Sequence, residues 1–114
     1  MRALNRSAIG VRPRPPFLEW LHAVDPTSAS LTLADLGREP TIYLVSEGTD
    51  LEAEDADLHT VFHTIFEDQL NGWWRDQTAW PTPRSLGTFK RWFDCQFHSM
   101  LLDLTDEPLV EEDV

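Results

Sequence analysis

The chain of 114 residues contains a single cysteine, Cys95, which excludes any disulfide within it. One lone thiol is typical of a reducing compartment, so we expect a cytoplasmic protein. The first 17 residues are basic but contain no continuous apolar segment, which argues against a secretory signal. No apolar run approaches the roughly 20 residues of a membrane-spanning helix, and no membrane partner is expected.

Positive charge is also scarce, because nine Lys and Arg face twenty Asp and Glu and give a formal net charge of −11. Binding to a nucleic-acid backbone needs clustered cations, so we expect no nucleic-acid partner. The acids concentrate at 47–57 and 106–113. That concentration leaves a weaker alternative, in which the protein is an acidic mimic of nucleic acid that binds a basic protein.

The four arginines of residues 2–14 are the exception to this acidity, since no acid accompanies them. They indicate either a basic arm or an edge strand that charge keeps soluble. The sequence favours the edge strand, because residues 5–11 alternate loosely and Pro13 ends the pattern.

Motifs that fix a reaction are missing from the sequence. It has no Gly-rich phosphate loop, Ser-based elbow, paired cysteines or EF-hand spacing, and no internal repeat. Cys95 and His98 are close in sequence, but a nucleophilic pair also needs an orienting group and an oxyanion site. We therefore predict no catalytic residue and no cofactor, and the sequence leans away from an enzyme without deciding the question.

Large apolar residues are plentiful, with five Trp and six Phe, so residues 1–114 are expected to form one domain with one core. The strongest pattern runs from Asp50 to Asp76. Its apolar residues recur at spacings of three and four, which predicts a long central helix. These residues are Leu58, Val61, Phe62, Ile65, Phe66, Leu70 and Trp73. Thr49 and Glu52 form a capping box for its start.

Shorter patterns surround this helix. Residues 41–46 (TIYLVS) are apolar on both faces and predict a buried central strand. The remaining predictions are a helix over 16–24, a turn from Thr32 to Gly37, a helix from Pro83 to about Phe97, and a last strand over 98–104. Residues 1–4 and the acidic tail 106–114 are expected to fray.

These elements follow the order β-α-β-α-α-β, which predicts a three-stranded sheet packed against helices with one long central helix. The fold class is α+β or small α/β. The first βαβ step is expected to be a right-handed parallel crossover.

The candidate binding residues are Trp74, Arg75, Trp80 and Arg84. Trp73 continues the apolar stripe and is expected in the core, whereas Trp74 falls off that stripe. Trp74 and Trp80 either pack beneath the turn at 78–83 or form an exposed hot spot beside arginine. In the second case Arg75 and Arg84 would flank an anionic ligand.

A weak metal candidate lies on the central helix, where His59, His63 and Glu67 follow one another at spacings of four and share a face. No local Cys or His cluster completes the set or supplies its outer shell, so no metal is predicted.

The leading hypothesis is a small non-enzymatic protein-interaction or regulatory module, with self-association as a homodimer among its forms. The alternative is a small-molecule-binding or enzymatic domain with a pocket between the long helix and the sheet. Its polar residues would be His59, His63, Arg75, Arg84 and His98.

Overall fold

The structure is a computed structural model that describes residues 1–49 and 56–114, except for the side chains of 56–58. It confirms the α+β class, with a three-stranded antiparallel sheet and four α-helices in the described part. Single 3-10 turns lie at Pro26–Ser28 and Gln77–Ala79. The strands and helices are β1 (Arg2–Ala3), β2 (Arg6–Pro13), α1 (Pro15–Val24), α2 (Leu33–Leu36), β3 (Thr41–Ser46), α3 (Ala56–Trp73), α4 (Leu86–Trp92), β4 (Phe93–His98) and β5 (Leu102–Asp103).

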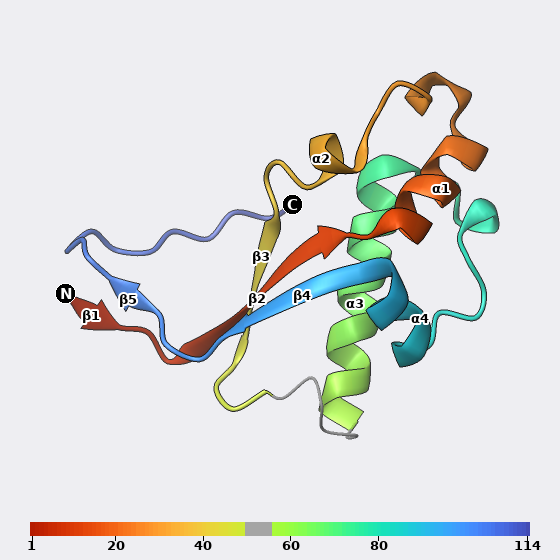
Figure 1. Ribbon diagram of the computed structural model, residues 1–114. Coiled ribbons are helices and arrows are strands. Elements are labelled where there is room, and N and C mark those ends of the chain that lie inside the picture. The colour runs from red at the N-terminus through yellow and green to blue at the C-terminus, as the bar shows by residue number, and fades with distance from the viewer. Residues whose placement is uncertain (50–55) are drawn as a thin grey trace.

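The main sheet has the order β3-β2-β4, and both pairings are antiparallel. Ile9 in the middle of β2 lies opposite Tyr43 of β3 and Phe97 of β4. A separate two-stranded ladder joins β1 to β5, with Arg2 opposite Asp103. Segments near the two ends of the chain therefore pair beside the main sheet, at the left of Figure 1, whereas the C-terminus itself lies away from the N-terminus.

The predicted positions of the first two strands are wrong, because β2 is the central strand and β3 is an edge. Residues Ser7 to Val11 are all buried on both faces of β2. Small residues make this possible. A Cβ atom added at Gly10 would lie 3.3 Å from Ile42 Cδ1, so the Ile42 side chain of the neighbouring strand covers Gly10. Pro13 stands at the last position of β2, where a missing N–H costs little.

The expected parallel crossover is also wrong, because β3 runs antiparallel to β2. Helices α1 and α2 stand beyond the end of β2 instead of crossing a face of the sheet (Figure 1). The chain therefore turns round at that end and comes back along β2. Thr32 caps α2 in a capping box with Asp35, and Gly37 ends the helix.

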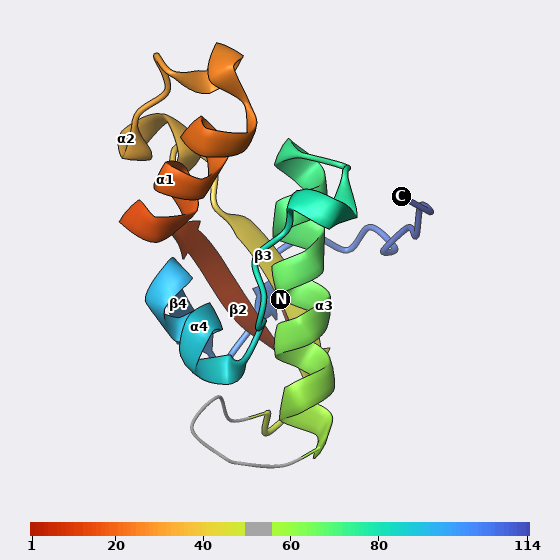
Figure 2. The same cartoon turned by 90° about the vertical axis from the view of Figure 1, so that its right-hand side faces the viewer.

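The core lies on one face of the sheet, where α3 and α4 pack, and α1 adds to it from the end of β2 (Figure 2). Aromatic rings fill it: Phe93 of β4 lies 5.3 Å from Phe66 of α3 and 5.4 Å from Phe17 of α1, measured between ring centroids. Burying such rings contributes most of the favourable free energy of a small core. The other buried apolar side chains of this cluster are Ile9, Val11, Leu21, Leu36, Phe62, Ile65, Leu70, Trp80 and Phe89.

The third predicted helix ends earlier than expected, at Trp92, and its last residues belong to β4. Phe93 is buried in the core from this strand, in register with Pro13 of β2, whereas Phe97, in register with Ile9, is 42% exposed. Six consecutive residues here have register partners in β2, so pairing with that strand takes the place of a further helical turn. The helix begins at Leu86, after the N-cap Ser85, whose hydroxyl accepts from Thr88 N at 3.1 Å. Of the last predicted strand, His98 instead ends β4 opposite Ala8, and Leu102–Asp103 pairs with β1.

The start of the central helix and its Thr49–Glu52 capping box fall partly outside the described residues, as do most acids of 47–57. Within the described ranges, no helix is long and apolar enough to cross a membrane.

Candidate functional site

The face of the sheet opposite the core carries two exposed aliphatic side chains. Ile42 and Leu44 of β3 are 55% and 54% exposed, whereas Tyr43 and Val45 alternate with them and face α3. Their neighbours across β2 are the small residues Gly10 and Ala8. The middle of the uncovered face is therefore apolar, and its residues project little from the sheet.

β3 is also an unprotected edge. In the described part of the chain it pairs only with β2, and the backbone groups on its outer side from Thr41 to Val45 have no hydrogen-bond partner. Natural edge strands usually carry charge, proline or a bulge against unwanted pairing. The six residues of β3 contain neither charge nor proline. The opposite edge, β4, contains Asp94 and His98.

Hydrogen bonds hold β3 firmly against α3. Tyr43 Oη donates to Asp68 Oδ2 at 2.5 Å, and Gln69 Nε2 donates to Tyr43 Oη at 2.8 Å and to Thr41 Oγ1 at 3.1 Å. Burial raises the pKa of Tyr43 above its usual value, and the bond to Asp68 raises it further. The phenol therefore stays protonated as a donor at neutral pH, and the edge strand is fixed in shape.

The sequence missed this edge because TIYLVS is apolar on both faces. The absence of charge predicted a strand buried between two others. An uncharged strand is equally compatible with an edge position that a partner covers. Tyr43 and Val45 alternate with Ile42 and Leu44 along the strand. This alternation distinguishes the packed face from the open one only when the position of α3 is known.

Two of the candidate binding residues, Trp80 and Arg84, lie beside each other. Trp80 is 8% exposed and its Nε1 donates to Trp74 O at 2.8 Å. The Arg84 guanidinium lies 5.7 Å from the centroid of the Trp80 ring, donates to Pro81 O at 3.1 Å and pairs with Glu67 at 3.6 Å. These contacts tie the connection between α3 and α4 to both the core and α3.

The neighbouring aromatic residues take less central positions. Trp73 is 39% exposed, so its expected place in the core is wrong. α3 ends at this residue, and Trp80 supplies the buried indole of the region instead. Trp74 is half-buried, and its Nε1 is buried without a hydrogen-bond partner among the described residues. Arg75 is exposed, and its side chain forms no hydrogen bond or ion pair with the described residues.

The histidines do not gather in one pocket. The rings of His59 and His63 lie 4.5 Å apart on α3, while Glu67 is engaged by Arg84. Within residues 1–49 and 56–114, no three His, Cys, Asp or Glu side chains are grouped to hold a metal ion. His98 projects from β4 opposite Ala8, on the uncovered face of the sheet.

Cys95 faces the core from β4, packed against its buried residues. Burial, and after it the neighbouring Asp94 charge, raise the pKa of its thiol to about 11. The thiol is therefore protonated at neutral pH, which is the opposite of what a nucleophilic cysteine needs. His98 lies on the other face of the strand.

Several acids have local structural roles. Asp25 and Asp76 accept backbone hydrogen bonds from Thr27 and Thr78, each at 3.0 Å, and Asp35 caps α2. The bonds from Thr78 hold the pKa of Asp76 below its usual value. These three carboxylates thus serve turns and helix ends.

No protein-family model, curated protein or solved structure matches the chain.

Proposed function

We propose that this protein is a non-enzymatic association module that pairs with a second copy of itself through β3. Two β3 strands would join antiparallel and turn two three-stranded sheets into one sheet of six. The proposal is supported above all by one observation, which is the uncharged, unpaired edge of β3.

The chemistry of the edge favours a second copy as occupant. A twofold axis through the pair places each residue of β3 against a residue of the same strand. Charged strands would bring like charges together in this way, at a cost in free energy. β3 has none to bring together, and its outer N–H and C=O groups from Thr41 to Val45 are available for the new ladder.

The exposed aliphatic side chains add apolar contact. Ile42 and Leu44 of the two copies would stand next to each other on the uncovered face, and each cross-strand pair would contribute roughly 0.2–1 kcal/mol. α3 serves as the backing that holds the strand flat through Tyr43. An interface of one strand per copy is small, so we expect a dissociation constant in roughly the micromolar range.

Sedimentation velocity over a range of protein concentrations tests the proposal. The full chain should shift from monomer to dimer as its concentration rises through the micromolar range. Leu44→Lys places a charge on each side of the twofold axis and should leave the protein monomeric. Because Leu44 is 54% exposed, a lysine fits there without disturbing the core.

Leu104→Lys is the matched control, since Leu104 is 78% exposed and lies outside the sheet. This variant should dimerise as the unmodified chain does. A chain that stays monomeric at roughly millimolar concentration would overturn the proposal. Equal dimerisation by Leu44→Lys would place the interface elsewhere and would also overturn it.

A further inference from the structure

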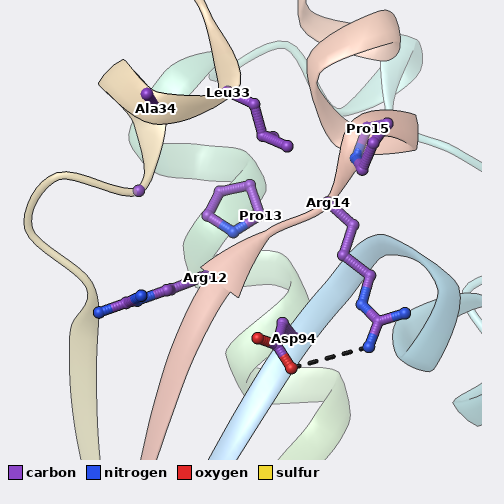
Figure 3. Close-up of a pocket in the computed structure, with 8 residues that line it drawn as sticks. Arg12, Pro13, Arg14, Pro15, Leu33, Ala34 and Asp94 are labelled. Carbon is purple, nitrogen blue, oxygen red and sulfur yellow. Dashed lines mark ion pairs between the residues drawn. The ribbon is translucent and has the colours of Figure 1, made fainter.

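A cleft lies where the end of β2 meets α1 and α2 (Figure 3). Its volume is about 570 Å³, within the range of sites for small molecules. The walls combine three charged side chains with mostly apolar ones. They are formed by Arg12, Arg14 and Asp94, and by Pro13, Pro15, Leu33, Ala34 and Gly37.

The charges at this cleft do not cancel. Arg14 Nη2 lies 3.7 Å from Asp94 Oδ1, and both side chains are largely exposed, so the pair is weak. Arg12 is the register partner of Asp94 across β2 and β4. Its side chain nevertheless extends away from Arg14 (Figure 3), and its guanidinium makes no ion pair or hydrogen bond with the residues that the structure describes.

Arg12 therefore lines the cleft as a guanidinium without an ion pair among the described residues, whereas Arg14 is engaged with Asp94, on a chain whose net charge is −11. The start of α1 adds to the positive field, because its first turn contains no acid and Arg14 makes no side-chain cap. Pro15 and Pro16 have no N–H to donate, so this contribution comes from the helix dipole alone.

A smaller hollow of about 340 Å³ continues from the cleft onto the uncovered face of the sheet. It shares Arg12 and Asp94 with the cleft and is lined further by Gly10, Ile42 and Gln96. Arg12 thus stands between two connected spaces, and a ligand of several carbon atoms has room on either side of it.

We propose that the cleft binds a monocarboxylic acid with a short apolar body. The carboxylate would lie at Arg12, whose planar guanidinium group matches its two oxygens. The apolar body would rest on Leu33, Ala34 and Pro13. A single negative charge suits this site better than a phosphate, because Asp94 at the mouth repels a doubly charged anion more strongly. This inference does not depend on self-association through β3.

The same chemistry has two sources, a free acid or a carboxylate beside apolar residues of the chain's own tail, where Leu109 and Val110 are exposed next to Glu111. Hexanoate is the probe, titrated into the ¹⁵N-labelled full chain and followed by amide shifts. Saturable shifts are expected around Arg12, Arg14 and Ala34. Hexanamide, which has the same body without the charge, should leave these amides unchanged.

Arg12→Met should weaken hexanoate binding roughly tenfold or more, because it removes a charge-assisted hydrogen bond. Arg38→Met is the matched control: Arg38 is exposed, pairs with Asp35 outside the cleft, and its loss should leave binding unchanged. Equal binding by Arg12→Met, or equal shifts with hexanamide, would overturn the proposal.

A synthetic peptide of residues 104–114 separates the two sources. Competition between this peptide and hexanoate for the same amides would identify the tail as a source of the carboxylate. Hexanoate binding without competition would identify a free acid. Repeating the titration on Leu44→Lys keeps any effect of self-association apart, since that substitution leaves the cleft intact.

Discussion

Tyr43 and Asp68 join the edge strand to the helix behind it, through a hydrogen bond of 2.5 Å between phenol and carboxylate. Gln69 donates to the same phenol oxygen from the next position of α3. Tyr43 is thereby fixed by two partners on one helix. An isolated edge strand would lose conformational entropy on pairing, and this anchoring removes part of that cost in advance.

Tyr43→Phe should lower the free energy of unfolding by about 1 kcal/mol, because it deletes the bond to Asp68 and the acceptor of Gln69. Asp68 is exposed and regains water, so a larger loss is not expected. Urea unfolding measures the change. Asp68→Asn, which keeps a weaker acceptor, should lose less. An unchanged urea midpoint for Tyr43→Phe would show that the bond contributes nothing to stability.

The same residue predicts a loss of stability in alkali. Burial raises the folded-state pKa of Tyr43 above the value of about 10 for an unfolded chain. Its contribution is therefore complete below about pH 10 and declines as the pH rises towards the folded-state pKa. The unfolding free energies of the unmodified chain and Tyr43→Phe should converge above about pH 10 when measured in urea. Parallel curves through that range would contradict the prediction.

Periodicity alone was sufficient to identify much of the core, since Phe62, Ile65, Phe66 and Leu70 are buried as the helical pattern predicts. It was insufficient where two periods fit one sequence. Phe89, Phe93 and Phe97 are spaced by four, which suits a helix, but the last two also alternate as a strand does. Only pairing with β2 decides between these readings, and pairing is not encoded locally.

The order of the strands and the position of the cleft could not be predicted from the sequence, for a related reason. β2 is central because small residues, Ser7, Ala8 and Gly10, let its neighbours close over it, and hydrophobic patterns give little weight to such residues. The cleft joins side chains from β2, α2 and β4 that lie up to about eighty residues apart. The arginine-rich start was visible in the sequence, but the uncompensated charge of Arg12 depends on where Arg14 and Asp94 lie.

Arg84→Met should destabilise the protein by about 1–2 kcal/mol, because Arg84 stacks on Trp80 and bonds to Pro81 O. Thermal unfolding followed by the fluorescence of the five tryptophans, Trp80 among them, measures the change in stability. Arg75→Met is the control and should change stability by less than about 0.5 kcal/mol, because Arg75 is exposed. Equal effects of the two substitutions would contradict a structural role for Arg84 and favour a shared surface role.

Cys95 should resist alkylation in the folded protein. Its pKa is raised from 9.0 to about 11, so the thiolate fraction at about pH 8 falls roughly 100-fold below that of an unperturbed thiol. Iodoacetamide should therefore react with the native chain at least that much more slowly than with the chain in denaturant. The native rate should keep rising up to about pH 11, whereas the denatured rate levels off near pH 9.

Asp94→Asn removes the nearby negative charge and should raise the native rate several-fold at about pH 8. A native rate equal to the denatured one would show that Cys95 is neither buried nor electrostatically protected.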